Sequence, residues 1–118
     1  LAAENFGPIL HVVRYDRHAL DSVIDAINST GYGLTMGLHT RLDGRVAHVA
    51  DRAQVGNLYV NRNIIGAVVG SQPFGGEGLS GTGPKAGGPH YLLRFTHERT
   101  LSVNTVASGG NTALLNLG

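Results

Sequence analysis

The sequence predicts an α/β fold in which βαβαβ units lie on a mainly parallel sheet. Two observations support this prediction. Along residues 9–61 the apolar residues change between strand-like runs and helical spacing, and a glycine-rich loop at residues 64–88 follows the last expected strand. Alternating strands and helices are typical of right-handed βαβ units. At 118 residues the chain fits one small domain or a piece of a larger one.

The first half of the chain changes its hydrophobic period twice. Residues 9–15 follow a Gly-Pro pair and are rich in β-branched and aromatic residues, which predicts a strand. A helix is then expected, because apolar residues recur at i, i+3, i+4 and i+7: Leu20, Val23, Ile24 and Ile27. Residues 34–39 alternate between apolar and other residues and predict a second strand.

A second helix and a third strand complete the expected units. The helix carries an apolar stripe from Leu42 to Ala53, and Gly56 marks its end. Residues 57–61 then read as a short strand. Beyond the loop, residues 91–95 suit a short helix or an extended run, and residues 100–104 alternate like a strand whose edge is open.

The loop at residues 64–88 holds nine of the eighteen glycines and two of the four prolines. Such a segment is either a flexible linker or an ordered ligand loop. We favour an ordered loop, because it embeds large apolar residues that need a packing partner: Ile64, Ile65, Val68, Val69, Phe74 and Leu79. In open α/β sheets ligands gather beyond the carboxyl ends of the strands, where this loop begins.

The composition disfavours several classes of function. Nine basic and eight acidic residues give a net charge of +1, and their scatter gives no electrostatic footprint for nucleic acid or an acidic membrane. Cysteine is absent, and no apolar run reaches the length of a membrane span. We therefore expect a soluble, cytoplasmic protein. Because the sequence begins with Leu1 and runs directly into patterned residues, we also expect a fragment.

The short motifs are weak when taken alone. Residues 76–81 match G-x-G-x-x-G, but they lie inside a loop and do not join a strand to a helix, and the sequence contains no P-loop. The six histidines form no i, i+4 pair, so we expect no metal site. Ser71 and Ser80 lie near glycines without a plausible base, so neither is a convincing nucleophile.

Three separated stretches change this picture. Residues 4–8 (ENFGP), 56–61 (GNLYVN) and 73–81 (PFGGEGLSG) resemble, in order and spacing, the C-terminal part of the aldehyde dehydrogenase superfamily over residues 1 to about 104. Residues 61–76 and 81–89 are similar to the pyrroline-5-carboxylate dehydrogenase module of the bifunctional proline utilization A family. The tail at residues 102–111 also resembles the end of that module.

The resemblance implies oxidation of glutamate semialdehyde to glutamate with reduction of NAD. The family's E-x-F-G-P motif maps onto Glu4, for the nicotinamide ribose hydroxyls, and Phe6, beside the nicotinamide. The loop that anchors the substrate carboxylate by backbone N–H groups maps onto Gly66 and Ala67, and Phe74 would flank the aliphatic chain. FAD is expected only if the parent protein also carries a proline dehydrogenase domain.

The resemblance also implies what these residues lack. The family's catalytic cysteine lies upstream of Leu1, so no catalytic residue is expected in this chain and the chain alone is expected to be inactive. Residues 1–98 would be the C-terminal part of the catalytic domain, and residues 99–118 a terminal strand and tail that associate with another subunit. The expected partners are therefore glutamate semialdehyde, the upstream remainder of the parent chain and a second copy.

Two alternatives remain open from the sequence. The chain could belong to another aldehyde dehydrogenase branch whose substrate has no carboxylate. It could also be a non-catalytic binding or oligomerisation module, with a purely structural glycine loop.

Overall fold

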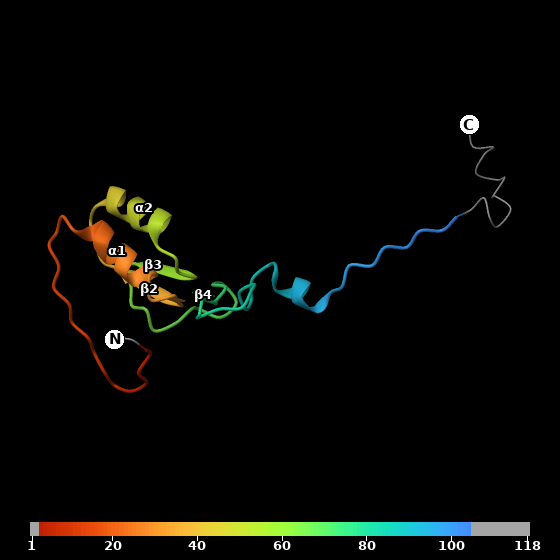
Figure 1. Cartoon of the computed structure of the whole chain (residues 1–118), viewed down its shortest axis with the longest axis horizontal. Helices are drawn as coiled ribbons and strands as arrows, with labels where there is room; N and C mark the ends of the chain where they lie inside the picture. The colour runs from red at the N-terminus through yellow and green to blue at the C-terminus, as the bar shows by residue number, and fades with distance from the viewer. Residues whose placement is uncertain (1–2, 105–118) are drawn as a thin grey trace.

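The computed structural model describes residues 3–104. Its elements run along the chain as shown in Figure 1: α1 (Leu20–Asn28), β1 (Tyr32–Gly33), β2 (Thr35–Leu38), α2 (Asp43–Arg52), β3 (Asn57–Val60), β4 (Glu77–Gly78) and the 3₁₀-helix η1 (Tyr91–Phe95). Both expected helices and the strands expected at residues 34–39 and 57–61 are therefore confirmed, with ends that shift by one or two residues. Within the described residues, no helix is long and apolar enough to cross a membrane.

Strands β2 and β3 are parallel neighbours, and α2 connects them. Thr35 lies opposite Asn57 at one end of the pair, and Leu38 lies opposite Val60 at the other. This is one βαβ unit, as the sequence predicts. A second, antiparallel pair joins β1 to β4, with Gly33 opposite Glu77. The glycine loop therefore contributes a strand of its own, which the sequence does not predict.

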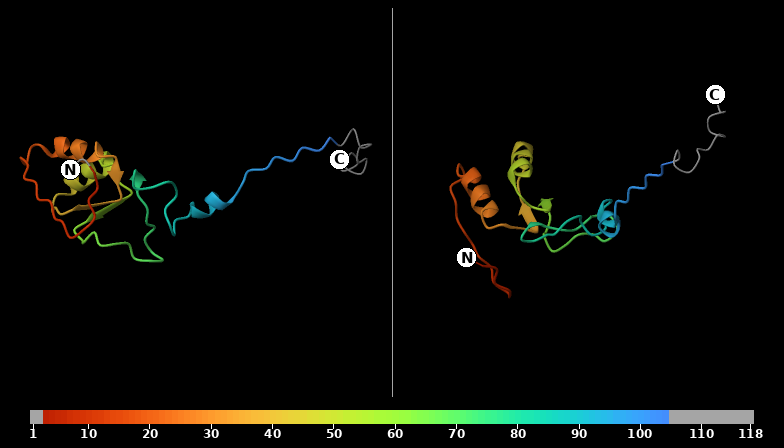
Figure 2. Two further views of the ribbon diagram at one scale, coloured as in Figure 1. Left: turned by 60° about the horizontal axis from the view of Figure 1, so that its bottom comes forward. Right: turned by 45° about the vertical axis from the view of Figure 1, so that its right-hand side comes forward.

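Helices α1 and α2 lie on the same side of the strands (Figures 1 and 2). Their apolar stripes bury one side chain each, Ile24 and Val49, at 2% exposure. These two are the buried apolar side chains among residues 3–104. Polar contacts also join the two helices. Arg52 Nη2 donates to Asp25 Oδ1 at 2.8 Å, and Asn28 Nδ2 donates to the Arg52 carbonyl at 2.9 Å.

The strand predicted at residues 9–15 is wrong. This segment forms no strand, and its side chains, including Leu10 and Val13, are exposed. Figure 1 shows it as an open trace that leads into α1. A strand exists only when a neighbour pairs with its backbone groups, and no other segment of the described residues does so here. The predicted βαβαβ arrangement is thus reduced to the single unit formed by β2, α2 and β3.

The terminal strand predicted at residues 100–104 is also absent from the structure, for the same reason. These residues have no strand assignment, and Leu101 and Val103 are exposed. They lead away from the helices and strands (Figures 1 and 2). The tail expected at residues 105–118 lies outside the described residues, so its predicted role is not addressed by the fold.

Candidate functional site

The glycine loop is tied to β3 by the side chains of Asn57 and Lys85. Asn57 is 5% exposed, and its Nδ2 donates to the carbonyls of Leu34 at 2.8 Å and Gly75 at 3.1 Å. Lys85 Nζ donates to the Gly56 carbonyl and to Asn57 Oδ1. Because a buried amide is costly unless its hydrogen bonds are made, this cluster fixes where the loop leaves and rejoins the sheet.

At two positions, 56 and 81, another part of the backbone approaches so closely that the residue has to be glycine. A Cβ at Gly56 would collide with the Gly75 carbonyl and would lie 2.7 Å from Gly76 Cα. A Cβ at Gly81 would collide with the Gly76 carbonyl. Backbone atoms cannot move aside as a side chain can, so only glycine fits at these crossings. The loop is therefore packed against its own backbone, as expected for an ordered loop, but its large apolar side chains are mostly exposed and do not supply the packing that the prediction relied on.

Gly66, Ala67 and Phe74 come together around one hollow of about 400 Å³. Phe74 is held there by a short antiparallel bridge. Its N–H donates to the Ala86 carbonyl at 3.0 Å, and the Ala86 N–H donates back at 2.9 Å. The structure thus groups the three residues that the resemblance assigns to the substrate.

Arg62 and Gln72 hold the turn that carries Gly66 and Ala67. Arg62 Nη2 donates to the Gly66 carbonyl at 2.7 Å, and Arg62 Nη1 donates to Gln72 Oε1 at 3.0 Å. The same Gln72 oxygen accepts from the Val68 N–H at 2.9 Å. The guanidinium carbon of Arg62 also lies over the Tyr59 ring, 4.1 Å from its centroid, so a side chain of β3 packs against the guanidinium.

The backbone N–H groups of Gly66 and Ala67 donate no hydrogen bond to any part of residues 3–104. Both residues are half-buried, and a Cβ at Gly66 would meet nothing within 4 Å. Unpaired N–H groups on a turn of small residues are suited to an anion, because no side chain stands between the ligand and the backbone. This edge of the hollow can therefore bind a carboxylate.

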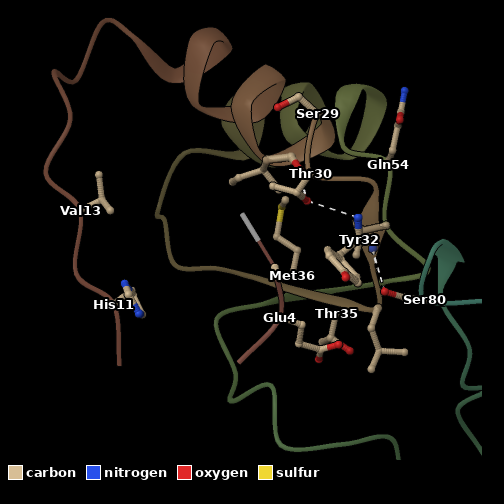
Figure 3. A pocket seen from close by; sticks show the side chains of 15 residues that line it. Glu4, His11, Val13, Ser29, Thr30, Tyr32, Thr35, Met36, Gln54 and Ser80 are labelled. Carbon is tan, nitrogen blue, oxygen red and sulfur yellow. Dashed lines mark hydrogen bonds between the residues drawn. The ribbon is translucent and has the colours of Figure 1, made fainter. Parts of the chain in front are cut away.

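Glu4 lies at a different place, in a larger hollow of about 920 Å³ between the N-terminal segment and the α1–β2 region. Figure 3 shows Glu4 with Tyr32, Thr35, Met36 and Ser80 around this space. Its carboxylate has no hydrogen-bond partner among the described residues. Ser80 is engaged, because its Oγ accepts from the Gly33 N–H at 3.1 Å.

Phe6 is 89% exposed and lines neither hollow. The structure therefore does not bring the two residues assigned to NAD next to the three assigned to the substrate. A free carboxylate beside open space fits the ribose role expected of Glu4, since it can accept from two hydroxyls. Their roles stay predictions.

The two side chains whose pKa is shifted, Asp21 and Arg52, lie between α1 and α2, away from both hollows. Asp21 accepts a 2.5 Å hydrogen bond from His48 Nε2 and faces Arg52 Nη1 at 3.5 Å. The His48 hydrogen bond, followed by the Arg52 charge, lowers the pKa of Asp21. A hydrogen bond to Asp25 and the nearby Asp21 charge raise the pKa of Arg52. Asp21, Asp25 and His48 are exposed and Arg52 is half-buried, so we assign this cluster to helix packing and not to chemistry.

The sequence reasoning missed Asn57, Arg62, Gln72 and Lys85 as organisers of the site. The sequence indicates them only by their position. Each of these polar residues stands beside or within a run of glycines and apolar residues, whose backbone carbonyls need hydrogen-bond donors. Residues 3–104 contain no cluster of His, Asp and Glu side chains suited to a metal ion.

Comparison with known proteins gives consistent matches. Residues 1–101 match the model of the aldehyde dehydrogenase family. The chain is 66% identical over 99 residues to the bifunctional protein PutA of Klebsiella aerogenes, covering 84% of this chain and 8% of that protein. It is 41% identical over 99 residues to the 1-pyrroline-5-carboxylate dehydrogenase of Bacillus subtilis (strain 168), covering 84% of this chain and 19% of that protein.

The solved structures agree with these relatives. A mutant of Bradyrhizobium japonicum proline utilization A (PutA) superposes with a TM-score of 0.81 at 65% identity, over 91% of this chain and 11% of that chain. The chain therefore spans only a small part of the proteins that it matches. The crossing glycines, the Asn57 cluster and the Gly66–Ala67 turn all lie within the residues that match the family model.

Proposed function

The chain belongs to the aldehyde dehydrogenase family, and from this premise we propose that it forms the substrate-carboxylate site of a glutamate semialdehyde dehydrogenase in proline catabolism. The enzyme would oxidise the aldehyde to glutamate with reduction of NAD. The choice of substrate is supported by relatives named 1-pyrroline-5-carboxylate dehydrogenase and bifunctional protein PutA. The chain would act as part of a longer protein.

One observation carries the proposal: the free N–H groups of Gly66 and Ala67 share a hollow with Phe74. Glutamate semialdehyde has a carboxylate at one end, an aliphatic middle and an aldehyde at the other end. The two N–H groups would bind the carboxylate, and the Phe74 ring would pack against the methylene groups. Binding at the carboxylate end positions the aldehyde at a fixed distance from the loop.

The reacting groups would come from the rest of the longer protein. The sequence of this chain contains no cysteine, so the family's thiolate nucleophile has to be supplied by other residues. The role of this chain is to bind and orient one end of the substrate. A substrate held at both ends reacts faster because the loss of its freedom is complete before the chemical step.

For the cofactor we propose Glu4 as the acceptor for the nicotinamide ribose hydroxyls, with Phe6 beside the ring. When bound, NAD would supply the hydride acceptor. The support is that Glu4 has a free carboxylate on the larger hollow. Phe6 is exposed, which leaves its ring available to border a planar group.

Exposed apolar side chains support assembly into a longer protein. Large apolar residues stay exposed along the N-terminal segment and after the loop, among them Leu10, Val12, Leu92 and Phe95. So many exposed large apolar side chains are expected where another part of a protein covers them. We propose that upstream residues cover the segment at 9–15 and give it the strand neighbour that it lacks here.

We propose the same for the end of the described chain. Residues 99–104 are exposed and carry no strand assignment, and we propose that they pair with a strand of a second subunit. Residues 1–98 would then belong to the catalytic domain. Light scattering of the longer protein with and without residues 99–118 tests this, and an unchanged mass would exclude the role.

The proposed activity is tested by following NAD reduction in the longer protein with glutamate semialdehyde and with butanal, which lacks the carboxylate. We expect kcat/KM to be higher for glutamate semialdehyde by at least about 100-fold, since two N–H groups bind a charged oxygen pair. Equal values for the two aldehydes would contradict a carboxylate site. No reduction with either would contradict the activity.

A further inference from the structure

A cluster formed by Tyr59, Arg62 and Gln72 holds the Gly66–Ala67 turn, and within it Arg62 does not line the hollow whereas Gln72 does. The turn could instead have been held by its own backbone, as at the Phe74–Ala86 bridge. We propose that Arg62 is a positioning residue that aims the Ala67 N–H into the hollow and selects aldehydes with a carboxylate. The inference rests on the proposed function.

The geometry of one peptide unit carries the argument. The carbonyl of Gly66 and the N–H of Ala67 belong to the same peptide group, and the described residues contain no cis peptide bond. In a trans peptide the C=O and N–H bonds point in opposite directions. Arg62 Nη2 holds the Gly66 oxygen at 2.7 Å, so the Ala67 N–H must point away from the guanidinium. On that side the Ala67 N–H has no hydrogen-bond acceptor in residues 3–104.

The Arg62 charge also strengthens that donor. A cation that binds a carbonyl oxygen draws electron density toward it and makes the N–H of the same peptide more positive. A carboxylate on the far side of the peptide would feel both this polarised N–H and the guanidinium charge behind it. Arg62 would thus favour an anion without touching it.

Three further contacts fix Arg62 so that it can act this way. The Tyr59 ring lies 4.1 Å from the guanidinium carbon, Gln72 Oε1 accepts from Nη1 at 3.0 Å, and the Asn63 carbonyl accepts from Nε at 3.1 Å. Gln72 also fixes the far end of the turn, because its Oε1 accepts a hydrogen bond from the Val68 N–H. The turn between residues 66 and 68 is therefore held at both ends by one guanidinium and one amide.

Replacement of Arg62 by Gln or Lys in the longer protein tests the proposal. We expect R62Q to raise KM for glutamate semialdehyde about tenfold, through loss of the oriented and polarised donor. KM for butanal and kcat for both aldehydes should stay near the unsubstituted values. R62K should fall between, because a lysine can reach one carbonyl but cannot bind Gly66 and Gln72 together in a planar fork.

One matched variant separates positioning from a general effect of lost charge. Arg45→Gln removes one positive charge from the exposed face of α2 and should leave both substrates unaffected. If R62Q fails to fold, R62K provides the test, since a lysine keeps a positive charge at this position but cannot bind Gly66 and Gln72 together.

The outcomes are distinct. A rise in KM confined to glutamate semialdehyde supports the role of Arg62. An equal change for both aldehydes, or no change for either, overturns it while the proposed function stands. If the unsubstituted protein itself shows no preference for glutamate semialdehyde over butanal, the proposed function fails, and the role of Arg62 fails with it.

Discussion

The helix–strand region at residues 20–60 and the glycine loop at residues 64–88 are ordered in different ways. In the first region, apolar stripes face strands, and Ile24 and Val49 are buried between them. In the loop, Ile65 and Val69 are 91% and 97% exposed, and order comes from hydrogen bonds made by Asn57, Arg62 and Lys85. A site that must bind an anion by its backbone thus depends on polar side chains and close-packed glycines, with little apolar burial.

This difference has a functional consequence. A segment held by apolar burial would pair its backbone N–H and C=O groups with a neighbouring segment, as β2 and β3 pair with each other. A loop held from behind by side chains can leave selected N–H groups unpaired on its front.

The largest effect is expected for Asn57→Ala in the longer protein. The substitution removes the donor of the Gly75 carbonyl and releases Lys85 from one acceptor, whereas the Leu34 carbonyl keeps the backbone N–H of residue 57. We expect the local free energy of unfolding to fall by about 3 kcal/mol, because three hydrogen bonds of a buried side chain are lost at about 1 kcal/mol each. Hydrogen exchange read by mass spectrometry should accelerate in peptides from both the loop and β3. Acceleration in the loop alone would show that the two regions are independent.

Gly56→Ala tests the close-packed crossing. The new methyl group would collide with the backbone of Gly75 and Gly76, so the loop has to move. We expect destabilisation of about 2 kcal/mol, typical of overpacking against atoms that cannot rotate away. Thermal inactivation of the longer protein measures it. An inactivation temperature equal to that of the unsubstituted protein would contradict the crossing.

Gly44→Ala is the matched substitution in the helix–strand region. Gly44 lies in α2, and a Cβ there would meet nothing within 4 Å. Because alanine is the better helix former, we expect a gain of about 0.5–1 kcal/mol in the local stability of α2. Slower hydrogen exchange in α2 would bear this out. A loss of stability would mean that other residues of the longer protein pack against this site.

The smallest effect is expected for Asp21→Asn, and it depends on pH. Hydrogen bonding from His48 and the charge of Arg52 lower the pKa of Asp21 below its ordinary value of 3.8. A carboxylate whose pKa is lowered by folding stabilises the fold above the unfolded pKa, and this stabilisation disappears as pH falls through the folded pKa. Melting temperatures of the variant and the unsubstituted protein should therefore differ slightly at pH 6 and converge as the pH falls below 3.8 and through the lowered pKa of Asp21. A difference that persists in acid would point to another cause.

The sequence predicts the helix–strand region well and the site only in part. Helical spacing from Leu20 to Ile27 and the alternation at residues 34–39 depend on neighbours in sequence, so they survive in the structure. Residues 9–15 have strand-like composition but no pairing partner, and composition cannot supply one. The grouping of Gly66, Ala67 and Phe74 came from family resemblance, whereas the roles of Arg62 and Asn57 needed coordinates, because their partners are backbone carbonyls that any residue has.

The most direct measurement is residue-resolved hydrogen exchange of the longer protein with its product. Glutamate carries the α-carboxylate proposed to bind the Gly66 and Ala67 N–H groups, whereas 4-aminobutyrate keeps the rest of the chain and lacks that group. We predict slower exchange of these two amides at saturating glutamate and no change with 4-aminobutyrate. Equal protection by both ligands, or none by glutamate, would contradict a carboxylate site on this loop.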